Sequence, residues 1–435
     1  MTPQPPSPLR YQVVATGIGE LAGRLAQLLS ISLVGWVLGV EALGIVGIAW
    51  SLTAIATAIV QSGPELAGMA DMPRHSAPGG LIAQVGGLRI VGGLLAVPLL
   101  FLAAFTLGLN REDILLQVGM QGIALLAASA GLAWVFRGLG QARRQGLLRL
   151  LQAALTLLFL GGGLLAWRSP LVLPLAEALA AGICVVVGLS FLARDGLGRP
   201  WLAWPSWPLA RTSLALGAVT CLSNLTWMLP IVTTSPAAPL EEVSHLTASL
   251  RLILGFNGIM QVFFLALFPR IGLVTIQDPA RGRSLALALA LQSALLCLLL
   301  VALAAPLSEP ILRLAFGPEF GAAAPLLGAL LPVLVPVALA SPIAYAFMAN
   351  GRPSLATWTQ GLTTLVVAGG IWFATAQAMG AWAALVLHPA LWFQAMLSLF
   401  LAFRHNLVAW PPGEWYKACD PRHLFLAARF PKGKV

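Results

Sequence analysis

The sequence predicts an all-α polytopic membrane protein, with about twelve transmembrane helices in two six-helix halves around a central cavity. Of its 435 residues, 59% are hydrophobic and 9% are charged, and the mean hydropathy is +0.88. Soluble globular proteins carry about 25% charged residues, so this chain cannot present a mostly aqueous surface. Apolar stretches of about 20 residues, the length a helix needs to cross the hydrocarbon core, recur along the whole chain.

The spans are separated by short segments rich in glycine and proline, such as Gly63-Pro64 and Ser169-Pro170. We predict an N-terminal half over 1–200, a C-terminal half over 201–405 and a basic cytoplasmic tail over 406–435, near anionic lipid headgroups. The predicted spans are 13–37, 42–62, 79–107, 114–136, 147–167, 171–192, 212–234, 244–268, 284–305, 325–349, 354–376 and 380–403.

The distribution of basic residues predicts the orientation. With a cytoplasmic N-terminus, and with Arg149 at the start of its span counted as cytoplasmic, 19 of the 25 Lys and Arg residues lie in cytoplasmic segments, 3 lie in the opposite loops and 3 lie within spans. Cytoplasmic loops carry the excess of Lys and Arg in membrane proteins. An even number of spans then places both termini in the cytoplasm, and we expect the bacterial cytoplasmic (inner) membrane.

Composition excludes several classes of function. The net charge of +10 comes from residues between apolar spans, without the interleaved aromatic residues of a nucleic-acid-binding face, so we expect no nucleic-acid partner. The three lysines are Lys417, Lys432 and Lys434, all in the tail, so no Walker A loop is present. The four cysteines are too far apart for a zinc motif, and we expect neither a cofactor nor a metal site.

Polar residues inside spans are the candidates for function, because a charge at the centre of a span costs about 2.5–3.5 kcal/mol. The first span carries Thr16, Glu20, Arg24 and Gln27 at spacings that place all four on one helical face. Glu20 can pair with Arg24 one turn away. Two interpretations stay open: a neutralised pair that packs between helices, or one side of a hydrated cavity.

Three further spans contribute candidates. The second has a stripe of small residues that includes Ser51, which permits close helix approach, and the seventh carries Asn224. The eighth carries Arg251, either as a cavity residue or as an arginine that reaches the outer interface near Glu241. Arg89 in the third span is interpreted as structural or lipid-facing.

Three passages resemble the oligosaccharide and polysaccharide flippase family of the multidrug/oligosaccharidyl-lipid/polysaccharide (MOP) exporter superfamily. The first is the turn of the first hairpin, Gly35-Trp-Val-Leu-Gly39-Val-Glu-Ala-Leu-Gly44. The second is the eighth span, with Ala248, Arg251 and Leu252 followed by an apolar run that ends at Pro269. The third is the segment Ile311-Leu-Arg-Leu-Ala-Phe316-Gly317-Pro-Glu319-Phe320.

The resemblance implies a role for particular residues. The lipid II flippases of this superfamily have essential cavity arginines in helices one and eight, and Arg24 and Arg251 occupy the matching positions. An arginine expected in their helix two is absent here, where Ser51 and Gln61 are the polar residues. The resemblance therefore implies a glycan-lipid other than lipid II.

We therefore expect translocation of a lipid-linked (polyprenyl-diphosphate) oligosaccharide by alternating access, for cell-surface polysaccharide or lipopolysaccharide biosynthesis. Its partners would be the lipid-linked glycan, membrane lipids, and a polysaccharide polymerase or glycosyltransferases. The first alternative is a multidrug or cation antiporter of the same superfamily, and the second is a membrane-embedded glycosyltransferase or ligase. The expected substrate-binding residues are Arg24, Arg251, Glu20, Gln27, Ser51 and Asn224.

Overall fold

The structure, a computed structural model, describes residues 9–72, 75, 78–197, 203–277 and 279–409. For residues 9–16, 261–277, 279 and 281 it describes the backbone alone. The predicted boundary at residue 200 and nearly all of the predicted tail lie outside the described residues.

The described chain is helical and membrane-spanning, as predicted. Nine of its helical segments are long and apolar enough to cross a bilayer, and the first of them contains a kink that divides it into two spans. The segments that correspond to the twelve predicted spans are α1 (Leu9–Thr57, both of the first two spans), continued by α2 (Gly63–Asp71); α3 (Gly79–Thr106); α4 (Glu112–Ser129) with α5 (Ala133–Gly138); α6 (Ala142–Ala166); α7 (Val172–Arg194); α8 (Trp207–Thr234); α9 (Leu240–Gln277); α10 (Pro279–Ala304); α12 (Ala324–Leu330) with α13 (Leu334–Ala349); α14 (Pro353–Ala376); and α15 (Leu387–Arg404).

The turn between the first two spans is built on one glycine. Gly39 has φ 79° and ψ −168°, a conformation that side chains strongly disfavour, and there the direction of α1 changes. The segment from Gly35 to Gly44, expected from the sequence to form the first hairpin turn, therefore contains that turn. The short helix α11 (Ser308–Phe316) packs beside it, where Trp36 donates a hydrogen bond to the Leu314 carbonyl at 2.9 Å.

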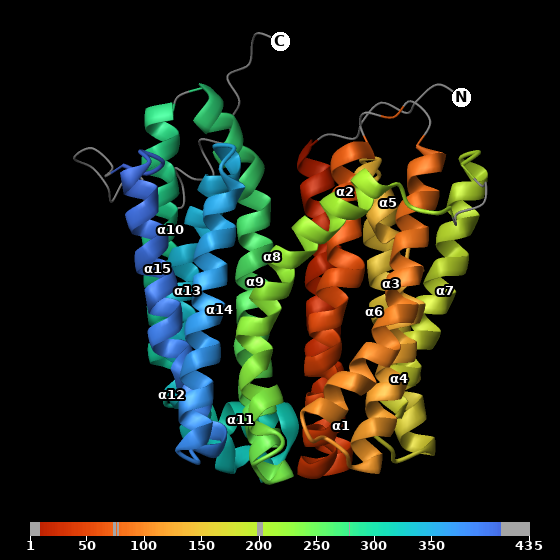
Figure 1. Cartoon of the computed structure of the whole chain (residues 1–435), viewed down its shortest axis with the longest axis vertical. Coiled ribbons are helices and arrows are strands. Elements are labelled where there is room, and N and C mark those ends of the chain that lie inside the picture. Colours follow the sequence, from red (N-terminus) through yellow and green to blue (C-terminus); the bar gives the residue numbers. More distant parts are fainter. Residues whose placement is uncertain (1–8, 73–74, 76–77, 198–202, 278, 410–435) are drawn as a thin grey trace.

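The helices gather in two groups (Figure 1). Helices α1 to α7, red to yellow, lie together, and α9 to α15, green to blue, lie together. Helix α8 runs between the groups and packs against α2 in the first and α14 in the second. The first helix begins, and the last one ends, at the same end of the molecule (Figure 1).

The outer surface is apolar. Large side chains such as Leu165 (90% exposed), Leu158 and Trp372 point outward, whereas small residues and leucines fill the interior. A soluble protein does not expose so many large apolar side chains, and a bilayer accommodates them. The chain is a multi-pass integral membrane protein.

The two groups meet closely along α1 and α9, and small residues permit this contact. A Cβ atom at Gly44 would lie 2.8 Å from the Leu240 carbonyl oxygen, and one at Gly47 would lie 2.6 Å from Cγ2 of Thr247. The stripe of small residues predicted in the second span is therefore a packing surface. We call the contact between α1 and α9 the α1–α9 seam.

Gly47→Ala should destabilise this seam, because the added methyl group overlaps the Thr247 side chain. We expect a loss of about 1–3 kcal/mol, the usual cost of overpacking, seen as a lower melting temperature in detergent. Thr247→Ala in the same chain should recover part of it. Gly162→Ala is the matched control, since a Cβ there meets nothing within 4 Å, and it should be neutral or stabilising. Equal melting temperatures for Gly47→Ala and Gly162→Ala would contradict the described contact between α1 and α9.

Arg89 of α3 has a structural role. Its guanidinium donates hydrogen bonds to the carbonyls of Gly131 (2.6 Å) and Ala128 (3.0 Å), where the fourth span breaks between α4 and α5. It also lies 3.1 Å from a carboxylate oxygen of Glu65 in α2. The broken helix exposes carbonyl oxygens that need donors, and the buried arginine supplies them.

Candidate functional site

One face of α9 carries the polar and small residues of the α1–α9 seam. Thr247, Arg251, Gly255 and Gly258 follow one another at spacings of four, four and three, so they share a face. Thr247 meets Gly47, and a Cβ at Gly255 would lie 3.5 Å from Leu28. The N-terminal half of this face thus packs on the second span and the C-terminal half on the first.

Arg251 is buried, with 5% of its surface exposed. Its guanidinium carbon lies 2.9 Å from the centroid of the Trp50 ring of α1. Within the described part of the chain, its Nε and Nη2 atoms are buried without a hydrogen-bond partner. The alternative that Arg251 extends toward the Glu241 region at the helix start does not fit this burial.

An aromatic ring compensates a buried cation only in part. A desolvated cation–π contact contributes about 2 kcal/mol, whereas an isolated charge in a low-dielectric interior costs considerably more. The N–H groups at Nε and Nη2 of Arg251 therefore remain able to donate hydrogen bonds to an acceptor. An anion at this position would accept those hydrogen bonds and neutralise the charge.

Glu177 of α7 is a carboxylate inside the first helix group. Its Oε2 atom accepts a hydrogen bond from Gln121 of α4 at 2.8 Å. Glu177 and Gln121 belong to the first helix group and Arg251 to the second.

Arg24 lies on the same seam as Arg251. A Cβ at Gly258 would lie 3.3 Å from Cδ of Arg24, which places the arginine against α9. Gly258 is seven residues beyond Arg251, or about 10 Å along the helix. Arg24 and Gln27 are both exposed, in contrast to the buried Arg251.

The expected pairing of Glu20 with Arg24 is not what the structure shows. Glu20 accepts a hydrogen bond from Arg137 of α5 and lies 3.8 Å from Nε of Arg149 in α6. The reason is the packing of α1 on α6, where a Cβ at Gly19 would lie 3.0 Å from the Gly146 backbone. Four residues turn a helix by roughly 40° beyond one full turn, enough for Glu20 to face α6 and Arg24 to face α9.

Ser51 and Asn224 form hydrogen bonds with backbone carbonyls. Ser51 is fully buried and donates to the Gly47 carbonyl at 2.7 Å within its own helix. Asn224 of α8 donates to the Ala54 carbonyl of α1 at 3.2 Å. Ser51 faces the interior and Asn224 ties α8 to α1, and their binding of substrate stays a prediction.

A second ion pair joins the start of α6 to the end of α7. Arg144 at the start of α6 donates a hydrogen bond to Asp195, which follows α7, and stacks near the rings of Phe136 and Phe191. This hydrogen bond holds the pKa of the Asp195 carboxyl below its ordinary value. The pair joins two helix ends and shows no sign of a binding role.

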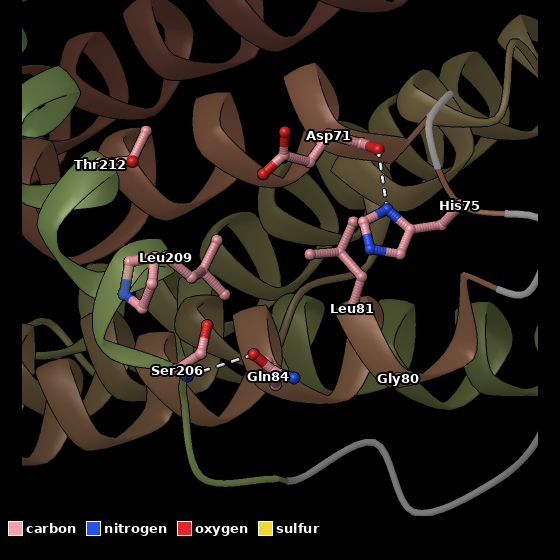
Figure 2. Close-up of a pocket in the computed structure, with 9 residues that line it drawn as sticks. Asp71, His75, Gly80, Leu81, Gln84, Ser206, Leu209 and Thr212 are labelled. Atoms are coloured by element: carbon pink, nitrogen blue, oxygen red, sulfur yellow. Dashed lines mark hydrogen bonds between the residues drawn. The ribbon is translucent and has the colours of Figure 1, made fainter.

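A polar cavity of about 340 Å³ lies between α2, α3 and the start of α8. Figure 2 shows Asp71 and His75 on one side of it and Gln84 and Ser206 on another. The His75 ring contacts the Asp71 carbonyl at 3.0 Å, and the Ser206 backbone N–H donates to Gln84 at 3.1 Å. The second of these bonds anchors the segment that leads into α8 onto α3.

Comparison with known proteins identifies the fold. No family model matches the chain, and no curated protein matches it. Solved structures do match over nearly the full length. The inward-facing conformation of a multidrug resistance MATE family transporter of the MOP superfamily matches with TM-score 0.63 at 14% identity, covering 92% of this chain and 94% of that one.

The chain has the fold of the MOP-superfamily transporters. A eukaryotic MATE transporter matches with TM-score 0.63 at 12% identity, covering 96% of this chain and 98% of that one. A MOP-superfamily transporter from Pyrococcus furiosus, described as having a binding pocket of reverse polarity, matches with TM-score 0.62 at 14% identity over 91% and 95% of the two chains. The flippase family within this superfamily was expected from the sequence, and the comparisons establish the shared MOP fold.

Several residues near the site were missed at the sequence level. Arg137 and Arg149 were counted only as cytoplasmic charges, and Trp50 and Gln121 were not considered. The signal for Arg149 was available, because this arginine lies within the predicted span 147–167. No pattern in the sequence indicates that Trp50 meets Arg251, since that contact depends on how α1 packs on α9.

Proposed function

We propose that this protein transports an anionic, lipid-linked oligosaccharide across the bacterial cytoplasmic membrane by alternating access. Arg251 carries the proposal: it is a buried cation between the two helix groups whose Nε and Nη2 atoms have no acceptor among the described residues. Guanidinium groups stay charged when buried and bind phosphate oxygens through two parallel hydrogen bonds. A polyprenyl diphosphate supplies such oxygens at one end of an apolar chain.

The α1–α9 seam suits a movement between two states. Its contacts join the two helix groups, so a relative rotation of the groups opens or closes it. Arg24 meets α9 at Gly258, about 10 Å along that helix from Arg251, and cargo can interact with one arginine and then the other. No Walker A lysine is present, so a gradient or consumption of the product drives the cycle.

A second candidate is a multidrug antiporter, because two of the structural matches named above are described as MATE transporters and one as a multidrug resistance protein. The charged residues at the site support this candidate less well than they support an anionic cargo. A site for cationic drugs calls for acidic groups that are free of partners, whereas Glu20 is paired with Arg137 and Glu177 accepts from Gln121. The polarity of this seam favours an anion.

The orientation that goes with the proposal has its own test. With both termini cytoplasmic, reporter fusions after residues 110 and 240 should be active outside, and fusions after 145 and 280 inside. These positions alternate between the two ends of the helix bundle, so the expected signals alternate as well. Uniform or inverted signals would exclude the proposed orientation.

The experiment for the function itself is loss of transport on substitution of Arg251. A host strain that depends on this protein for glycan export should lose surface glycan with Arg251→Gln and keep it with a change of a remote exposed arginine, Arg313→Gln. Retained export with Arg251→Gln would refute Arg251 as the residue that binds the cargo. Unchanged surface glycan in a strain that lacks the protein would refute glycan transport and favour the multidrug candidate.

A further inference from the structure

The group around Glu20 carries more positive than negative charge. One oxygen, Oε1 of Glu20, accepts a hydrogen bond from Nη2 of Arg137 and another from Nε2 of Gln145 at 3.4 Å. Nε of Arg149 lies 3.8 Å from the same oxygen, too far for a hydrogen bond. Three donors thus converge on one acceptor atom.

The arrangement leaves one donor unused. Nε of Arg149 is buried and has no hydrogen-bond partner among the described residues. A carboxylate has two oxygens on one plane, whereas a phosphate presents three around a tetrahedral centre. A phosphate at the position of the Glu20 carboxylate would accept from Arg137, Arg149 and Gln145 together.

The charged side chains of the cluster are partly exposed, whereas Gln145 is buried, with 2% of its surface exposed. The side chains of Glu20, Arg137 and Arg149 are 20%, 33% and 36% exposed, in contrast to the 2% of the structural Arg89. Arg149 lies about 10 Å along α6 from the start of that helix. Arg24, one turn along α1 from Glu20, lies beside the cluster on the side of α9.

We propose that Arg137, Arg149 and Gln145 form a docking site for a phosphoryl group, and that Glu20 is a resident carboxylate which the phosphoryl group displaces. The ligand class is a lipid-linked phosphate or diphosphate, so this inference rests on the proposed function. Displaced Glu20 stays near Arg24, which moves its charge toward the α1–α9 seam. The site is the first contact of the cargo, and Arg251 is a later one.

Glu20→Gln provides the test because the two interpretations predict opposite signs. If Glu20 competes with the ligand, the neutral amide should tighten binding of geranylgeranyl diphosphate by at least about fivefold. If the cluster is only structural, the same change should leave binding unchanged or weaken it. Dissociation constants would be measured by calorimetry on the full chain in phosphatidylcholine nanodiscs.

Further variants and probes complete the design. Arg149→Gln should weaken binding about tenfold and Arg149→Lys should restore part of it, since lysine keeps the charge and loses the planar fork. Arg143→Gln is the matched control: it removes an exposed arginine of the same helix, on a different face. Inorganic pyrophosphate tests recognition without a lipid, and geranylgeraniol tests the lipid without charge. We expect binding of the first and not of the second.

The outcomes separate this inference from the proposed function. Diphosphate binding that depends on Arg251 and is insensitive to Glu20 and Arg149 would overturn the docking site alone. Tighter binding by Glu20→Gln together with unchanged surface glycan in a strain that lacks the protein would support the docking site and overturn the proposed function. Absence of diphosphate binding in both the parent and Glu20→Gln would overturn both.

Discussion

Arg251→Gln should reduce glycan export about 10- to 100-fold while the melting temperature of the protein stays the same or rises. The export effect follows from the loss of charge-assisted hydrogen bonds to the cargo, which contribute about 1.5–3 kcal/mol. The stability effect has the opposite sign, because the substitution removes a buried cation whose Nε and Nη2 atoms have no partner in the described chain. Surface glycan and thermal unfolding in detergent measure the two effects.

Arg251→Lys distinguishes charge from geometry in this prediction. Lysine keeps the positive charge and loses the planar fork, so export should recover only in part. Full recovery with lysine would mean that charge alone suffices. A large drop in melting temperature for Arg251→Gln would instead make Arg251 a structural residue.

Arg89→Gln should behave in the reverse way, with a large loss of stability. Arg89 is as buried as Arg251, but its guanidinium is bonded to two carbonyls and paired with Glu65. Breaking a buried ion pair by removing one partner costs about 3–5 kcal/mol, because the other charge remains buried. We expect little folded protein in the membrane, measured by fluorescence-detected chromatography.

Glu65→Gln in the Arg89→Gln chain is the control for that loss. The second change removes the carboxylate left without a partner, so part of the folded protein should return. The carbonyls of Ala128 and Gly131 still lack their donor, which limits the recovery. If Arg89→Gln accumulates normally and fails only in export, Arg89 belongs to the transport site.

The comparison of the two arginines shows what the sequence could predict. Both are charged residues in apolar spans, and the free-energy cost of a charge in the membrane is enough to mark them as candidates for a special role. Their roles differ because of their surroundings. The break in the fourth span after Ser129 supplies carbonyls for Arg89, and no proline in that segment announces the break.

The spans themselves were predictable, because their length and hydropathy are local properties of the sequence. In lipid, the backbone N–H and C=O groups of such a segment must be hydrogen-bonded within the protein, and a helix does this within the segment itself. Gly39 was predictable as the first turn for the same local reason. The partners of Glu20 were not, since the side of α1 that faces α6 or α9 depends on packing between glycines far apart in the chain. Trp50 under Arg251 is a consequence of the same packing.

Lipid translocation in a purified system tests the central proposal most directly. The full chain would be reconstituted in phosphatidylcholine vesicles with a fluorescent prenyl diphosphate in both leaflets, and a membrane-impermeant reductant would quench the outer leaflet. The parent protein should allow quenching to proceed well beyond half of the signal, and Arg251→Gln should stop it near half. Equal quenching by both proteins, or by vesicles without protein, would contradict the assignment of Arg251 as the residue that binds the anionic cargo.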